Sequence, residues 1–113
     1  MQFLGYTIGD ANTQYPEPTP EQYARMGEFI EEATKAGMLL ATGGLAPADQ
    51  ATKVIRSGGE FTVVDGPFTE AKELIGGWAL MECRDKAEAI EWSKRFLDVA
   101  GDGETRIRQT FGP

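Results

Sequence analysis

The sequence contains no histidine among its 113 residues. This absence excludes Ser-His-Asp and Cys-His catalysis, together with every metal site that needs an imidazole ligand. Any acid–base chemistry would have to use aspartate, glutamate, lysine or tyrosine. We therefore predict neither a metal site nor a cofactor for this chain.

Cysteine is almost absent as well, because Cys83 is the only one. A lone cysteine cannot form an internal disulfide, which fits a reducing compartment, and we expect Cys83 to be a small buried apolar side chain. The first residues lack the basic region and long apolar core of a signal peptide. No apolar run approaches the ~18 residues that span a bilayer. We expect a cytoplasmic protein with no membrane partner.

Positive charge is sparse, since 11 Lys and Arg face 18 Asp and Glu, for a net charge of −7. Arg106 and Arg108 form a tight basic pair, which is too small for a nucleic-acid footprint. An acidic chain is also repelled by phosphate backbones. We expect no nucleic-acid partner. The length and the 41% apolar composition are typical of one globular domain, here residues 1–113.

Caps and periodic apolar positions predict an alternation of strands and helices. Thr19-Pro20-Glu21-Gln22 offers an N-cap, a proline at the first helical position and a capping-box glutamine. Asp85 and Glu88 offer a second cap, and Gly58-Gly59 can supply the positive φ angles of a hairpin turn. The expected elements are strands at about 2–9, 38–42, 78–84 and 104–111, hairpin arms at 53–57 and 60–65, helices at about 20–36 and 86–99, and a short helical turn at 69–73.

This order is the βαββαβ plan of a ferredoxin-like antiparallel α+β sheet with an added hairpin. Both helices would cover one face of the sheet and leave the other face bare. The bare face should carry apolar side chains, which usually mark an interaction surface. Its expected members come from Leu4, Tyr6, Ile8, Trp78 and Leu80, or from the residues that alternate with them along the strands. We predict a homodimer, or a larger homo-oligomer, that buries sheet against sheet.

A distinctive motif runs from Val63 to Glu73, VVDGPFTEAKE, and is followed by Gly76-Gly77-Trp78. These residues resemble the DGPF-domain branch of the YCII-related protein family, and the likeness extends over nearly the whole chain. The resemblance implies a ferredoxin-like fold assembled as a dimeric α/β-barrel type of oligomer. It also implies a cleft where relatives have a proposed His-Asp pair for acid–base or elimination chemistry. Because this chain has no histidine, that pair cannot be carried over.

The motif supplies the candidate site. Asp65 is either a turn residue that bonds downstream backbone N–H groups or a catalytic acid/base, and the turn role is the more common one for such an aspartate. Phe68, Glu70, Lys72 and Tyr6 are candidates for ligand binding; the competing interpretations are core packing for the aromatic residues and an exposed ion pair for Glu70 and Lys72. For Gly76-Gly77 a bulge or tight packing against Trp78 is favoured over a ligand contact.

The sequence is compatible with three functions. The first is an oligomeric small-molecule-binding or regulatory protein with a cleft beside the DGPF turn. A second is a cofactor-free, lyase-like enzyme that uses Asp65. The third, implied by the association of some DGPF proteins with alternative sigma factors, is an accessory that binds another protein.

Overall fold

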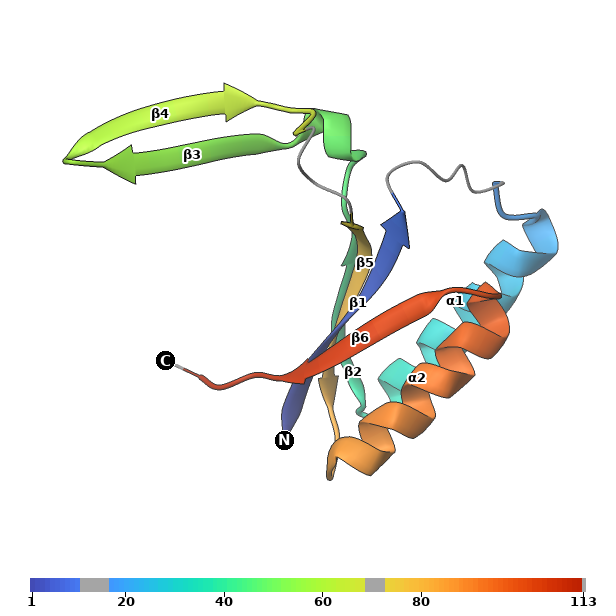
Figure 1. Ribbon diagram of the computed structural model, residues 1–113. Helices are drawn as coiled ribbons and strands as arrows, with labels where there is room; N and C mark the ends of the chain where they lie inside the picture. Colours follow the sequence, from blue (N-terminus) through green and yellow to red (C-terminus); the bar gives the residue numbers. More distant parts are fainter. Residues whose placement is uncertain (11–16, 69–72, 113) are drawn as a thin grey trace.

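Two helices cover one face of a four-stranded antiparallel sheet, and a separate hairpin projects from the end of that sheet (Figure 1). The computed structural model describes residues 1–10, 17–68 and 73–112. The strands are β1 (Gln2–Asp10), β2 (Leu39–Gly44), β3 (Thr52–Ser57), β4 (Glu60–Asp65), β5 (Glu73–Glu82) and β6 (Glu104–Gln109); the helices are α1 (Pro20–Lys35), α2 (Lys86–Ala100) and the 3-10 turn η1 (Ala48–Gln50).

The main sheet has the strand order β2-β5-β1-β6, with antiparallel pairing throughout. Strands β3 and β4 pair with each other in a second sheet. Setting the hairpin aside, the chain order is βαββαβ, which agrees with the predicted ferredoxin-like α+β arrangement. The turn of the hairpin is made by Gly58 and Gly59, whose φ angles are +60° and +83°.

The helix termini follow the predicted caps. The backbone N–H of Gln22 donates to Thr19 Oγ1 at 3.2 Å, while the N–H of Thr19 donates to Gln22 Oε1 at 2.8 Å. At the start of α2, the N–H of Glu88 donates to Asp85 Oδ1 at 2.9 Å. Each bond satisfies a backbone donor that has no partner within the helix. The capping signals in the sequence therefore located both helix starts correctly.

Several strand boundaries differ from the prediction. The strand expected at 78–84 runs from Glu73 to Glu82, because a bulge within it accommodates Gly76 and Gly77 and lets the pairing with β1 continue. Glu73 opens this strand, so the helical turn predicted for 69–73 does not reach it, and residues 69–72 lie outside the described part of the chain. The second strand extends through Gly44, and the last strand ends at Gln109 instead of residue 111.

The core lies between the sheet and the two helices. Its buried members come from both helices and from strands or strand ends: Phe3, Ala33, Met38, Met81, Cys83 and Ala89. Phe29 of α1 holds the helices together, because its ring lies 6.0 Å from the ring of Trp92 and 6.4 Å from that of Phe96. Trp92 and Phe96 of α2 therefore pack against α1.

The opposite face of the sheet, here called the open face, carries no helix (Figure 1). Directly paired residues place Leu4 beside Leu80 and Tyr6 beside Trp78 on this face, and all four are half-buried in the single chain. Arg106 and Arg108 of β6 pair with Tyr6 and Leu4, so they border the same apolar patch. The expected apolar composition of the open face is confirmed for these four residues. Ile8, also expected there, is half-buried and pairs with Ile75 beyond a register shift.

Candidate functional site

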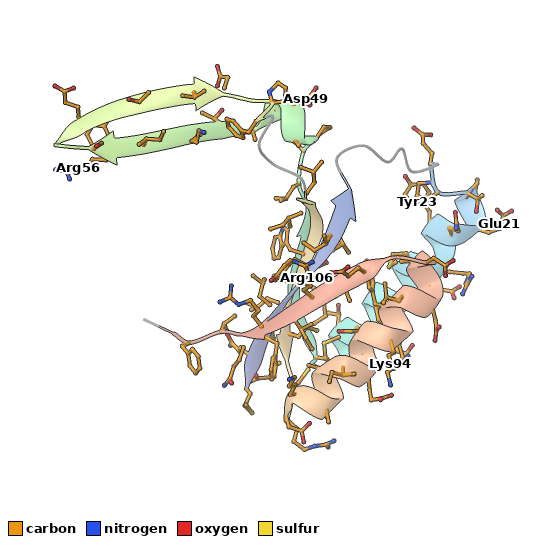
Figure 2. All side chains as sticks on the ribbon, viewed as in Figure 1. Glu21, Tyr23, Asp49, Arg56, Lys94 and Arg106 are labelled. Carbon is orange, nitrogen blue, oxygen red and sulfur yellow. The ribbon has the colours of Figure 1, made fainter. Side chains whose placement is uncertain are left out.

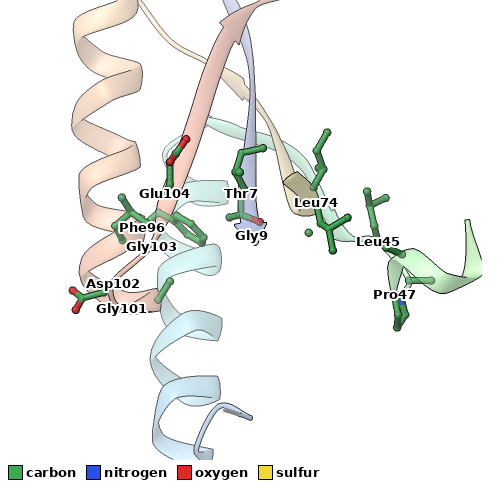
Figure 3. Close-up of a pocket in the computed structure, with 17 residues that line it drawn as sticks. Thr7, Gly9, Leu45, Pro47, Leu74, Phe96, Gly101, Asp102, Gly103 and Glu104 are labelled. Carbon is green, nitrogen blue, oxygen red and sulfur yellow. The ribbon is translucent and has the colours of Figure 1, made fainter. Parts of the chain in front are cut away.

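A cavity of about 410 Å³ lies where the end of α2 meets the ends of β1 and β5. Its wall is completed by the loop that leads from β2 into η1. Most of the side chains in this wall are aliphatic or aromatic (Figure 3). The lining residues include Thr7 of β1, Leu45 of the loop, Leu74 of β5, and Phe96, Leu97 and Ala100 of α2.

A β-bulge shapes the sheet side of the cavity. Tyr6 pairs with Trp78 and Ile8 pairs with Ile75, so two glycines of β5 stand opposite the single residue Thr7. The N–H of Gly77 donates to Thr7 Oγ1 at 2.8 Å, which provides a partner for a donor displaced from the regular ladder. A Cβ atom on Gly76 would lie 3.1 Å from the same Oγ1. The predicted bulge at Gly76-Gly77 is confirmed.

The bulge also anchors the loop that forms the outer wall. The N–H of Leu45 donates to the carbonyl oxygen of Gly76 at 2.8 Å. This bond carries the pairing of β2 with β5 one step beyond Gly44 and directs the chain toward Pro47 and Ala48, which also line the cavity. The wall is thus fixed by backbone hydrogen bonds as well as by packing.

The DGPF turn lies behind this wall. The N–H of Gly66 donates to the carbonyl oxygen of Ala51 at 2.7 Å. A Cβ atom on Gly66 would lie 3.1 Å from the carbonyl oxygens of both Ala48 and Ala51, so only glycine fits without displacing the backbone. The turn therefore holds η1 in place, and Ala48 of η1 is part of the cavity wall.

Charged groups lie at the margin of the cavity. Asp102 points away from the other labelled side chains (Figure 3). Glu104, the first residue of β6, is exposed and accepts a hydrogen bond at 2.6 Å from Nε of Arg106 on the same strand. The hydroxyl of Thr7 is already bonded to Gly77. Among the described lining residues the interior of the cavity is therefore mainly apolar.

None of Asp65, Phe68 and Tyr6, the predicted site residues that the structure describes, lines this cavity. Asp65 ends β4, and its Oδ1 accepts a hydrogen bond from Thr52 Oγ1 at 3.0 Å across the base of the hairpin. The first backbone N–H downstream of Asp65, that of Gly66, donates to the carbonyl oxygen of Ala51. Phe68 is half-buried under the ammonium group of Lys53, whose Nζ lies 4.7 Å from the ring centroid. Glu70 and Lys72 lie outside the described residues.

Tyr6 lies on the open face, in a second and shallower hollow of about 570 Å³. Leu4 and Trp78 share this hollow, and Arg108 stands at its side. The structure thus places Tyr6 on one face of the sheet and Asp65 at the hairpin base, with no contact between them among the interactions of the described residues. Sequence reasoning missed the cavity residues, and only the Gly76-Gly77 pair pointed toward that region.

The Cys83 thiol has a raised pKa but lines neither of the two hollows. Burial raises the pKa of the Cys83 thiol above its ordinary value of 9.0, and Glu88 adds to this effect, but Cys83 belongs to the core. Within residues 1–10, 17–68 and 73–112, no three acidic or cysteine side chains come together as a metal site. In the same part of the chain, neither helix has the length and apolar character required to cross a bilayer.

Comparisons with known proteins identify relatives of this chain. An uncharacterized protein of Rhizobium meliloti (strain 1021) is 37% identical over 82 residues, which is 70% of this chain and 66% of that protein. A geranylgeranylglyceryl phosphate synthase of Pyrococcus horikoshii is 31% identical over 91 residues, which is 79% of this chain but 32% of that protein. The chain thus spans just under two thirds and about one third of these relatives. The YCII-related domain matches residues 1–107, and the chain belongs to the YCII-related family.

Proposed function

We propose that this protein binds a small molecule in the cavity between the end of α2 and the ends of β1 and β5. The observation that supports this most is the wall of the cavity, which encloses about 410 Å³ with mainly apolar side chains. Ligand pockets typically have volumes of about 300–1,000 Å³ and largely apolar linings. The DGPF turn contributes by holding η1 against the outer wall.

The lining favours an uncharged, largely apolar ligand. Its described residues include two carboxylates, Asp102 and Glu104, and no lysine or arginine. An anionic ligand would lose its hydration without gaining a counter-charge, which is costly in an apolar site. Leu74 and Phe96 provide the type of surface against which an alkyl chain or a small ring is stabilised.

Binding can be tested by thermal unfolding with simple probes. The straight-chain alcohols from butanol to octanol, and indole, should raise the unfolding midpoint, because a ligand that binds only the folded state stabilises it by mass action. Stabilisation by 1 kcal/mol corresponds to roughly 4–8 °C in a domain of about this size. Amide chemical-shift changes should cluster around Leu45, Leu74 and Ala100.

A pair of variants separates the cavity from general hydrophobic binding. Ala100→Phe fills the cavity at the end of α2 and should abolish the shift in midpoint. Ala87→Phe adds the same ring to an exposed position in the first turn of the same helix and should leave the shift unchanged. No stabilisation by any probe, or equal stabilisation of both variants, would contradict the proposal.

A binding role has more support than the lyase-like alternative. That alternative depends on Asp65, and the contact observed for Asp65 is the cross-strand bond to Thr52. Asp65 lines neither of the hollows described above. A carboxylate outside the cavity cannot transfer a proton to a ligand within it, since proton transfer needs hydrogen-bond reach.

We also propose that two copies associate through their open faces. Leu4, Tyr6, Trp78 and Leu80 form a continuous apolar patch there, and such patches usually mark interaction surfaces. Sedimentation equilibrium should show a dimer at tens of micromolar, and Leu80→Asp should weaken it strongly. A wild-type monomer at that concentration would refute this assembly without affecting the cavity test.

A further inference from the structure

The β3–β4 hairpin extends away from the rest of the chain, on the side of the sheet opposite the helices (Figure 1). Arg56 marks its distant end in Figure 2. The Cα radius of gyration is 16.4 Å, whereas a compact domain of this length has about 13 Å. The difference indicates an arm that the chain itself does not cover.

The two faces of the hairpin differ in exposure. Direct pairing places Val54 beside Val63, and Arg56 beside Phe61, on one face, here called the Val54 face. Val54, Val63 and Phe61 are 66%, 65% and 70% exposed. On the other face, Val64 is 39% exposed, and the nearby Lys53 contacts Phe68. The Val54 face therefore presents the larger uncovered apolar surface.

This arrangement is unfavourable for an isolated chain. A two-stranded hairpin on its own is at best marginally stable in water, and contiguous exposed apolar residues indicate a contact surface. The three side chains of the Val54 face would give up roughly 60–120 Å² each on burial, or about 200–350 Å² together. A standard interface needs about 800 Å² from each partner. The hairpin alone is thus too small to hold a partner.

A partner seated on the open face would supply the missing area, because the hairpin projects on that same side of the sheet (Figure 1). A twofold pairing of open faces brings two hairpins to the same interface and doubles their contribution.

We propose that the Val54 face of each hairpin packs against a second copy of this chain that is seated on the open face. The hairpin then acts as an arm that clasps the partner, and it becomes ordered when the dimer forms. This inference rests on the open-face dimer proposed above and adds a distinct second contact to it.

Two neighbouring valines provide a matched test. Val63→Thr introduces a hydroxyl on the Val54 face, and Val64→Thr makes the same change on the opposite face of the same strand. In sedimentation equilibrium Val63→Thr should weaken the dimer by about tenfold or more, because the hydroxyl is buried twice in each dimer; Phe61→Thr should weaken it further. Val64→Thr should stay within about threefold of wild type.

Hydrogen exchange gives an independent measurement on the unmodified protein. Amides in residues 52–65 should exchange slowly at concentrations above the dimer dissociation constant and rapidly below it, because only a second copy makes their protection depend on concentration. Three outcomes would each overturn the clasping arm and leave the open-face dimer standing. They are a stable dimer that Val63→Thr does not weaken, equal weakening by both valine variants, and amide protection that does not change with concentration. A wild-type monomer would overturn both.

Discussion

The hydroxyl of Thr7 should contribute measurably to stability, because it is the partner of a backbone donor that the bulge removes from the sheet ladder. Thr7→Val keeps the shape of the side chain but leaves the N–H of Gly77 without its 2.8 Å bond. A fully buried orphan donor costs about 1–3 kcal/mol. Since Gly77 is half-buried, water can partly compensate, and we expect a loss of about 1–2 kcal/mol.

Urea unfolding at fixed protein concentration is the appropriate assay, because self-association would otherwise change the apparent stability. With a slope of about 2 kcal/mol/M, the midpoint should fall by roughly 0.5–1 M. Thr105→Val is the matched control, since Thr105 pairs directly with Thr7 on β6. Its hydroxyl only donates to the carbonyl oxygen of Tyr6 at 3.2 Å, so its removal leaves no N–H unpaired and should cost less than about 1 kcal/mol. Equal losses for both variants would refute the reasoning about the bulge.

Three further predictions concern the core and the turn. Burial raises the pKa of the Cys83 thiol above 9.0, so the unfolded chain loses this proton at lower pH than the folded chain. The free energy of unfolding of the wild type, measured in urea, should therefore fall more steeply above pH ~9 than that of Cys83→Ala. Ala89 is fully buried, so Ala89→Leu should destabilise by about 1–3 kcal/mol in urea, whereas Ala87→Leu on the exposed side should have little effect. Gly66→Ala should speed hydrogen exchange around η1, because the new Cβ would meet two carbonyl oxygens at 3.1 Å; Gly44→Ala, which meets no atom within 4 Å, should not.

Most of the fold could be predicted from local signals in the sequence. The capping residues Thr19 and Asp85 fixed the helix starts, since a cap acts through neighbours three residues away. Gly58-Gly59 fixed the hairpin turn for the same reason. The boundaries of β5 were predicted less well, because its bulge forms only when β1 pairs with it. Pairing between distant strands is not encoded in any short window.

The candidate site shows the same division. Asp65 attracted attention because it stands in a conspicuous tetrapeptide, yet its observed contact is a structural bond to Thr52. Thr7 carries no local signal, and its contact with Gly77 spans 70 positions in the sequence. The cavity is assembled from four such separate segments, so its residues could be recognised only after the strands had been placed beside one another.

The DGPF turn can therefore matter to binding without taking part in chemistry. Gly66 donates a hydrogen bond to Ala51 at the end of η1 and lies so close to this turn that an added Cβ atom would meet two carbonyl oxygens. Ala48 of η1 is part of the cavity wall. Asp65, one residue earlier, closes the base of the hairpin through Thr52. One turn thus joins the proposed ligand site to the proposed clasping arm. A ligand that displaces η1 would also displace the base of the hairpin. Because such a coupling is reciprocal, association of two copies would change the affinity of the cavity by the same factor by which the ligand changes association.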